Sequence, residues 1–390
     1  MKIYFIKLFS KLSKKQIKFI FNHRQCDIII FDESHSELLS KYILRGFPFY
    51  IFKQRPEVFE LDFMSIMRIF LNFFSLLYKN NCNFHSLGLL IRSEIIKSIS
   101  PKIIITMIDN RTTLHGISLR LPAVACIQIQ NALRTNWELE RNMIKPVYYY
   151  ALGNDTLEKI KKIHPDQMTF KYKPAGSLRL SIAKSLDSFY TRKQKYDILY
   201  VSQLSDVIIT DNHWNLFPPQ LKLIKLFSEY VKQFCQNKRI GILLRTNSEL
   251  ENEFFASYFK KDEIINRDMS FPLISFSYLN SSRLVIGWFS TLLFEAAAIG
   301  KKILRIDYSD NKNDYNDYEN LVLFHPSKEE LFKKINETLD MTNHEYFQNY
   351  GNFINEIVEP QKTHDLIHSD IACYLKNNKF NDDWQDSASF

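Results

Sequence analysis

The chain has 390 residues, of which 45% are hydrophobic and 14% aromatic, enough for two or three domains with buried cores. Lysine and arginine outnumber aspartate and glutamate by 51 − 43 = 8. This positive balance suits acidic substrates or an anionic membrane surface, although an AT-rich gene would give the same excess of lysine. Because the sequence contains no nucleic-acid motif, we do not expect the protein to bind nucleic acid. The nine glycines are too widely spaced for a dinucleotide fingerprint or a P-loop, which excludes both classes of phosphate binder.

Short apolar runs alternate with helical periodicity along the chain, which is typical of parallel α/β units. In the first half we expect strands at 27–31, 47–52, 102–108, 124–130, 147–152 and 169–174. The helices expected between them are 36–44, 61–78 and 155–163.

A polar segment, 181–195, is interpreted as a linker, and a second α/β series follows it. Its expected strands are 196–202, 239–244, 284–288, 302–306 and 321–324, and its expected helices are 219–236, 249–258, 292–299 and 328–339. The predicted organisation is an N-terminal domain, a linker, a C-terminal domain and a disordered polar tail, over 1–180, 181–195, 196–375 and 376–390. Two such halves predict a cleft between the carboxyl ends of their strands.

Cysteine and histidine give no indication of a metal site or a cofactor. The five cysteines are scattered and form no Cys-x-x-Cys pair, as expected of reduced cysteines in a cytoplasmic protein. His364 and His368 share a helix face without a third ligand nearby, so we interpret them as a surface pair. The chain also lacks an Asp-x-Asp pair, so a nucleotide-sugar site that depends on a metal is not expected.

Two apolar segments carry enough charge to argue against a membrane span. Lysines interrupt 1–21, and Asp62, Arg68 and Asn72 interrupt 61–78, whereas a span needs roughly 20 clean residues. Both segments are predicted to be amphipathic helices. They either pack on a core or lie on the inner face of the cytoplasmic membrane, with lysines toward anionic lipid.

The strongest motif lies in the second half, where a buried strand leads into Ser290-Thr291 and then Glu295 one helical turn later. A helix beginning at Ser290 offers free N–H groups to a phosphate without a glycine loop, and Glu295 is suited to ribose hydroxyls. The alternative is that Ser290 and Thr291 only cap the helix and Glu295 forms a surface salt bridge.

The pattern Ser-Thr-x-x-x-Glu-Ala-x-x-x-Gly-Lys resembles the nucleotide site of GT-B glycosyltransferases, particularly polysialyltransferase and Kdo-transferase relatives and CDP-glycerol polymerases. In the first half, the segments 103–110, 127–134 and 174–179 resemble bacterial surface carbohydrate biosynthesis proteins. The resemblance extends from about residue 27 to residue 302.

This resemblance implies a GT-B fold: α/β, with two Rossmann-like parallel-sheet domains facing a cleft. A nucleotide sugar would bind the C-terminal domain and a glycan acceptor the N-terminal one, with no further cofactor. Ser290 and Thr291 would then hold the donor phosphate and Glu295 the ribose. Many relatives carry His-Pro where this chain has Arg245-Thr246, so Arg245 is the candidate replacement, since a guanidinium binds two oxygens at once.

Two aspartates are candidates for catalysis because each follows a predicted strand. Asp109 is placed to deprotonate an acceptor hydroxyl in an inverting reaction. Asp206 lies in a Gln-x-x-Asp segment that resembles retaining β-Kdo transferases, in which the aspartate is a nucleophile. The alternative for both is a loop cap, a common role for aspartate after a strand.

Four further residues are candidates for binding the acceptor. Glu33 and His35 follow the first strand, where they either face the cleft or start the next helix. Gln130 and Asn131 follow the strand at 124–130.

The leading hypothesis is a metal-independent glycosyltransferase of the cytoplasm or the inner membrane surface, which builds lipopolysaccharide, O-antigen or capsule. Its partners would be a nucleotide sugar, with a CMP-linked acidic sugar such as CMP-Kdo favoured, and a glycan or lipid-linked glycan. The alternatives are a GT-B-shaped nucleotide-sugar epimerase and a non-catalytic polysaccharide assembly protein.

Overall fold

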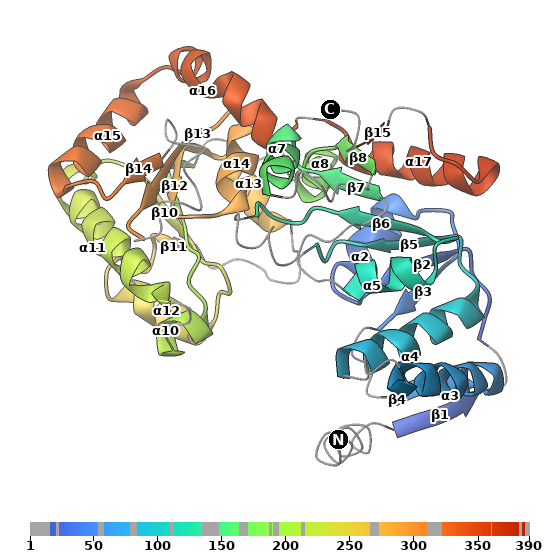
Figure 1. Cartoon of the computed structure of the whole chain (residues 1–390). Helices are drawn as coiled ribbons and strands as arrows, with labels where there is room; N and C mark the ends of the chain where they lie inside the picture. Colours follow the sequence, from blue (N-terminus) through green and yellow to red (C-terminus); the bar gives the residue numbers. More distant parts are fainter. Residues whose placement is uncertain are drawn as a thin grey trace.

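The computed structural model describes most of the chain. The described residues are 16–20, 23–53, 58–78, 84–109, 113–134, 148–163, 171–186, 189, 195–211, 215–265, 273–309, 322–359, 361–381 and 384–386. They form two α/β halves (Figure 1).

The N-terminal sheet has seven strands in the order β15-β8-β7-β6-β5-β2-β3, all parallel except β15. Its central strands are apolar and fully buried, because helices cover a parallel sheet on both faces. The strands are β2 (Ile28–Phe31), β3 (Phe49–Phe52), β5 (Ile103–Thr106), β6 (Ala125–Ile129), β7 (Tyr148–Ala151), β8 (Lys171–Pro174) and β15 (Gln385–Asp386).

The C-terminal sheet has six strands, all parallel, in the order β11-β10-β9-β12-β13-β14. The first three strands run outward from β9 and the next three outward from β12, so the strand order reverses between β9 and β12. The strands are β9 (Tyr196–Val201), β10 (Ile240–Leu243), β11 (Ile264–Ile265), β12 (Ser282–Gly287), β13 (Lys302–Asp307) and β14 (Val322–Phe324).

Every strand predicted from the sequence overlaps an observed strand, and every predicted helix except the one at 1–21 overlaps an observed helix. Four observed strands, β1 (Gln16–Ile20), β4 (Val58–Asp62), β11 and β15, and several helices were not predicted. In the N-terminal half the helices are α2 (Ser36–Leu38), η1 (Leu39–Ile43), α3 (Phe63–Tyr78), α4 (Phe84–Ile99), α5 (Thr113–Arg120), α7 (Asn154–Ile163) and α8 (Leu178–Lys184). After β9 come α10 (Asp206–Asp211), α11 (Phe217–Phe234), α12 (Glu249–Ala256), α13 (Ile274–Asn280), α14 (Thr291–Ala297), α15 (Lys328–Asp340), α16 (Asn343–Ile357) and α17 (Thr363–Asn377).

The C-terminal end of the chain returns to the N-terminal half, which corrects the predicted disordered tail. Helix α17 contacts α8 and η1, and β15 pairs with β8. Phe380 and Trp384, both buried, pack with Tyr148, and Trp384 also contacts Tyr150. These two aromatic side chains anchor the segment by apolar burial, although the overall composition of 376–390 is polar.

Helix α17 also corrects the interpretation of its two histidines. His364 is buried, with Nδ1 2.7 Å from the Ser181 hydroxyl, and Nδ1 of His368 is 2.8 Å from the carbonyl oxygen of Ile43. These hydrogen bonds fasten the last long helix to the N-terminal half.

The predicted linker 181–195 begins inside a helix. Ser177 caps α8 by accepting a hydrogen bond from the Leu180 N–H, and Ser181, Ile182 and Ala183 are buried. Gly176, at φ +78°, precedes this cap, and a Cβ there would lie 2.2 Å from the carbonyl oxygen of Glu359. Glycine is therefore required where the returning C-terminal segment crosses the start of α8.

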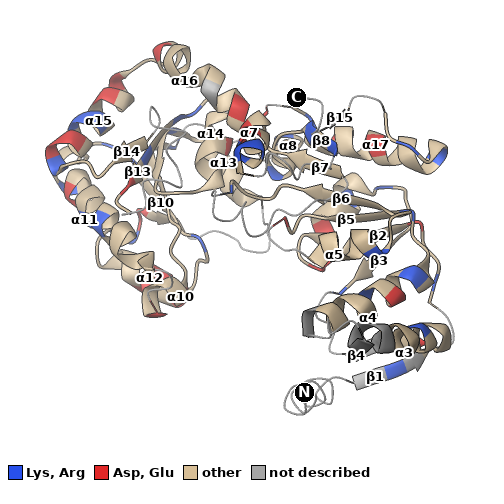
Figure 2. Ribbon diagram, viewed as in Figure 1, with Lys and Arg blue, Asp and Glu red and all other residues tan. Residues whose placement is uncertain are grey.

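A separate two-stranded parallel sheet pairs β1 (Gln16–Ile20) with β4 (Val58–Asp62), beside α3 and α4 (Figure 1). Residues 16–20 are thus a strand, not part of the predicted helix, and residues 1–15 lie outside the described part. Helix α3 confirms the helix expected at 61–78. Among the described residues, no helix is long and apolar enough to cross a membrane. Over the described residues, Figure 2 shows Lys and Arg interspersed with Asp and Glu in both halves.

Candidate functional site at the carboxyl edges of the two sheets

The carboxyl ends of β9 and β12 lie side by side at the point where the strand order of the C-terminal sheet reverses. Open α/β sheets bind ligands at this position. The chain leaving β9 passes Gln203, and the chain leaving β12 passes Phe289 and Ser290. The side-chain oxygen of Gln203 accepts a hydrogen bond from the Phe289 N–H at 3.1 Å, which fixes the two loops relative to each other.

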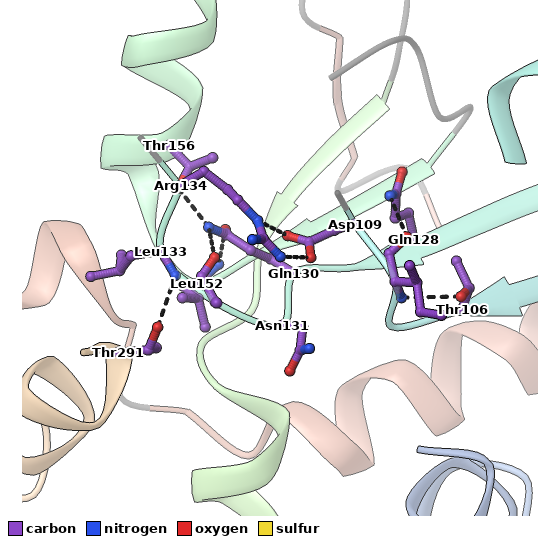
Figure 3. Close-up of polar contacts among 12 residues, drawn as sticks. Thr106, Asp109, Gln128, Gln130, Asn131, Leu133, Arg134, Leu152, Thr156 and Thr291 are labelled. Atoms are coloured by element: carbon purple, nitrogen blue, oxygen red, sulfur yellow. Dashed lines mark hydrogen bonds and ion pairs between the residues drawn. The ribbon is translucent and has the colours of Figure 1, made fainter. Parts of the chain in front are cut away.

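Ser290 and Thr291 begin α14 directly after this loop. Ser290 is the N-cap and accepts from the Leu292 N–H at 3.3 Å, as expected of a capping residue. The Thr291 hydroxyl accepts at 3.0 Å from the N–H of Leu133, which belongs to the N-terminal half (Figure 3). The start of α14 therefore touches the loop after β6. The phosphate contact predicted for Ser290 and Thr291 stays a prediction.

Glu295 lies one turn further along α14 and is fully buried, so the alternative of a surface salt bridge is wrong. The Ser177 hydroxyl donates to its Oε1, while its Oε2 has no hydrogen-bond partner among the described residues. Burial raises the pKa of Glu295, against the opposing effects of the Arg179 charge and the Ser177 hydrogen bond. The Ser177–Glu295 and Leu133–Thr291 hydrogen bonds define what we call the junction between the halves. The predicted ribose contact of Glu295 remains untested.

A buried carboxylate that sequence reasoning missed holds the loop after β10. Glu251, fully buried, accepts from the Ser202 hydroxyl at 2.8 Å and from the N–H groups of Arg245, Thr246 and Asn247 at 2.8–2.9 Å. The Thr246 hydroxyl also donates to it. The sequence contains a clue, since Ser248-x-x-Glu251 after a predicted strand fits a capping pattern, but the glutamate binds the preceding loop instead.

Arg245 is exposed on this loop, as its predicted contact with a phosphate requires. Its guanidinium donates to the Gln203 carbonyl oxygen at 3.0 Å, so the loops after β9 and β10 are joined. Arg245 and Gln203 thus lie together at the carboxyl edge.

Asp206 is exposed at the first position of α10. Its Oδ1 accepts from the hydroxyl of Ser248, the N-cap of α12, and its Oδ2 has no hydrogen-bond partner within the described ranges. One carboxylate oxygen is therefore available to a substrate, as the predicted catalytic role requires.

Asp109 presents the opposite arrangement. It is 2% exposed, and both of its oxygens accept from the guanidinium of Arg134, through Nε at 2.9 Å and through the terminal nitrogen (Figure 3). The ion pair with Arg134 thus uses both oxygens of the carboxylate that is predicted to act as a base. The catalytic role stays a prediction, while the geometry gives Asp109 the task of holding the loop after β6.

Gln130 is also engaged internally. It is 2% exposed, its amide donates to the Ala132 carbonyl oxygen and the Thr156 hydroxyl, both at 3.0 Å, and its oxygen accepts from the Leu152 N–H at 2.8 Å (Figure 3). These bonds use both the oxygen and the nitrogen of the side-chain amide and give Gln130 a structural task, while its predicted acceptor contact stays a prediction.

The other acceptor candidates divide into two places. Glu33 is exposed and pairs with Lys53 at 2.6 Å. His35 instead lies near the junction, where the Asn131 side-chain amide is 3.3 Å from its Nε2. Burial and the nearby charge of Arg179 lower the pKa of His35. The structure therefore brings His35 and Asn131 together and leaves Glu33 apart from them.

Comparison with known proteins adds evidence on the fold. No family model and no curated protein sequence matches the chain. Among solved structures, MnaA from S. aureus with UDP aligns with a TM-score of 0.53 and 13% identity, covering 93% of this chain and 97% of that one. The fold is GT-B.

Two further structures with this fold illustrate its range. A putative UDP-N-acetylglucosamine 2-epimerase from Listeria monocytogenes aligns with a TM-score of 0.53 and 12% identity, covering 91% of this chain and 96% of that one. The wall teichoic acid polymerase TagF aligns with a TM-score of 0.52 and 11% identity, covering 90% and 91%. At these identities the similarity establishes the GT-B architecture and leaves the reaction to be argued from the site.

Proposed function

We propose that this chain is a GT-B enzyme that transfers a sugar from a nucleotide donor to a bacterial surface polysaccharide or a lipid-linked glycan. The observation that carries the proposal is the polar cluster at the strand-order reversal of the C-terminal sheet. There Asp206, Arg245 and Ser290 lie on loops joined by hydrogen bonds through Gln203 and Ser248. Two structural neighbours support a nucleotide ligand, since the MnaA structure contains UDP and a TagF structure was soaked with CDPG.

In this proposal the donor phosphates bind at Arg245, Ser290 and Thr291, with Glu295 on the ribose side, and no metal or further cofactor takes part. Asp206 acts on the sugar through its unbonded oxygen, as nucleophile in a retaining reaction or as base in an inverting one. Of the two aspartates, Asp206 is the better catalyst because Asp109 is already paired with Arg134.

The direct test is titration of the protein with CMP-, UDP- and GDP-sugars, followed by assay of donor hydrolysis. We expect one donor to bind and turn over slowly without acceptor. Replacing Asp206 with Asn should lower turnover by about a hundred-fold or more with little change in donor affinity. Asp211→Asn, at the other end of the same helix, is the matched control. Absence of binding by every donor would refute the proposal.

Within this proposal, a CMP-linked acidic sugar such as CMP-Kdo is the donor that the sequence resemblance favours. Competition between CMP and UDP in calorimetry decides the nucleotide. Tighter binding of UDP would refute the CMP-linked donor while leaving the transferase intact.

A nucleotide-sugar epimerase is the second candidate, and it is favoured by the burial of Asp109 and Gln130, two residues expected to serve an acceptor whose side chains are bonded within the protein. An epimerase exchanges the proton on its sugar carbon with solvent and adds no glycan. A donor incubated in deuterated water distinguishes the two enzymes. A non-catalytic assembly protein, the third candidate, would keep polymer synthesis in cells after Asp206→Asn.

We also propose that the enzyme contacts the inner membrane surface through α3. Five large apolar side chains on this helix are 43–70% exposed, and β1, which pairs beside α3, follows the lysine-rich start of the sequence. The exposed residues are Phe63, Met64, Met67, Phe70 and Leu71.

Sedimentation with vesicles tests this contact. The protein should bind vesicles that contain anionic lipid, and Phe63→Ser with Leu71→Ser should weaken binding. Leu119→Ser, which changes an equally exposed leucine on α5, should leave it unchanged. Equal sedimentation of both variants would refute a contact through α3.

A further inference from the structure

Arg179 lies at the junction between the two halves with most of its hydrogen-bonding capacity unused. It is the second residue of α8 and is half-buried. One terminal nitrogen donates to the carbonyl oxygen of Asn131 at 2.9 Å, which directs the side chain toward the loop after β6. A guanidinium carries five N–H donors, and this is its one hydrogen bond within the described part of the chain.

Two titratable groups flank this guanidinium, one from each half. Burial lowers the pKa of His35 and raises the pKa of Glu295, so both shifts favour the neutral form, and the Arg179 charge acts on both side chains. No described carboxylate forms an ion pair with Arg179. The nearby pair, Asp109 with Arg134, is already neutralised internally. Arg179 therefore carries a positive charge at the junction without a paired anion from the described residues.

Two buried oxygens at the same place also lack partners among the described residues, Oδ1 of Asn131 and Oε2 of Glu295. Buried polar atoms are nearly always hydrogen-bonded in folded proteins. Asn131 contacts both Arg179 and His35, and Glu295 bonds to Ser177, two residues before Arg179. The unused donors of Arg179 are suited to an anion and the two unpartnered oxygens to hydroxyl groups, so one bound molecule that carries both kinds of group would complete the site.

We propose that Arg179 binds an anionic oxygen group of the substrate, a phosphate or a carboxylate, at the junction. This inference rests on the proposed function, because the anion is part of the nucleotide sugar. The geometry fits the role: a guanidinium binds two oxygens of such a group at once, and the neighbouring Thr291 begins the helix that faces the same loop. Arg179, on the N-terminal half, would contact the ligand opposite Arg245 on the C-terminal half, so one anionic ligand would bridge the halves.

Calorimetry with inorganic pyrophosphate, UDP and uridine tests the proposal on the full chain. Arg179→Gln should weaken pyrophosphate and UDP about ten- to a hundred-fold and leave uridine unchanged, since only the anions lose a charge-assisted contact. The affinity of Arg179→Lys for pyrophosphate and UDP should lie between those of the wild type and Arg179→Gln, because an ammonium keeps the charge but not the paired donors. Arg120→Gln, an exposed arginine of α5, is the matched control.

UDP-glucuronate and UDP-glucose distinguish the two sources of the anion. If Arg179→Gln weakens only UDP-glucuronate, the partner is a sugar carboxylate; if it weakens UDP and pyrophosphate, the partner is a phosphate. Unchanged binding of pyrophosphate, UDP and UDP-glucuronate by Arg179→Gln would overturn the site, provided thermal unfolding shows each variant folded. If the wild type binds pyrophosphate through Arg179 but none of the CMP-, UDP- and GDP-sugars, the anion site stands and the proposed function fails. If the wild type binds neither pyrophosphate nor any of these nucleotide sugars, both fail.

Discussion

At the carboxyl edge of the N-terminal sheet Asp109 and Arg134 pair with each other, whereas at the same edge of the C-terminal sheet Asp206 and Arg245 remain at the surface. The Asp109 side chain is fully buried and that of Arg134 is 9% exposed in their ion pair, and Gln130 is bonded through both its oxygen and its nitrogen. In the C-terminal half, Asp206 and Arg245 are exposed.

The difference follows from which residues hold each loop. In the N-terminal half Asp109, Gln130 and Arg134 themselves form the support, so these three side chains have little left for a ligand. In the C-terminal half Glu251 takes over that support by accepting the N–H groups of 245–247. The side chain of Arg245 is then presented by a loop that is already fixed.

The largest expected effect comes from breaking the internal pair of the N-terminal edge. Asp109→Asn leaves the buried guanidinium of Arg134 without its anion, and removing one partner of a buried pair costs about 3–5 kcal/mol. Urea unfolding measures this loss. Arg134→Met combined with Asp109→Asn should recover part of it, because no lone charge stays buried. A loss below about 1 kcal/mol would show that the pair is not the support of this edge.

The tail that returns to the N-terminal half should matter nearly as much. Trp384 makes edge-to-face contacts with Tyr148 and Tyr150, at ring-centroid distances of 5.1 and 4.7 Å. Trp384→Ala should therefore destabilise the protein by about 3 kcal/mol, the usual range for a buried aromatic. Thermal and urea unfolding measure it, and an unchanged midpoint would restore the original prediction of a disordered tail.

Glu251→Gln tests the support of the C-terminal edge. Glutamine keeps one acceptor oxygen and replaces the other with a donor, so several of the bonds from 245–247 are lost, at a cost of about 2 kcal/mol. Nucleotide affinity should fall together with stability because Arg245 loses its fixed position. Glu253→Gln, an exposed neighbour on the same helix, should change neither. If the Glu251→Gln protein is destabilised but binds the nucleotide with normal affinity, the loop held by Glu251 does not contribute to nucleotide binding.

The smallest effect concerns Glu295 and depends on pH. Because its folded-state pKa is raised, the protonated form is favoured by folding, and stability is lost as pH rises from the unfolded pKa through the folded one. Glu295→Gln removes this dependence. The variant should match the wild type in acid and gain over it toward neutral pH, by at most about 1.4 kcal/mol per pH unit. Parallel unfolding curves at every pH would contradict the buried, neutral carboxyl.

Much of the fold could be predicted from local pattern. The strands around β2, β5 and β12 are apolar runs buried on both faces, so composition alone identifies them. The missed strands are short or lie at edges: β11 and β15 have two residues each, and β15 is recognised only by its pairing with β8. The end of α8, residues 181–184, falls in the predicted linker because its polar composition suggests exposure. Contacts with residues distant in the sequence bury this segment instead.

For the site, the sequence by itself determined which residues follow strands: Asp109, Asp206, Arg245 and Ser290 all lie at carboxyl edges, as alternating strands and helices require. Only the tertiary structure decided what each carboxylate meets. Asp109 pairs with Arg134 from the loop after β6, and Glu295 accepts a hydrogen bond from Ser177 in the other half of the molecule. Asp206 has one carboxylate oxygen without a partner among the described residues. The reason is physical, since a residue's place on an element follows from local periodicity, whereas its charge partner and its burial depend on elements far away in the chain.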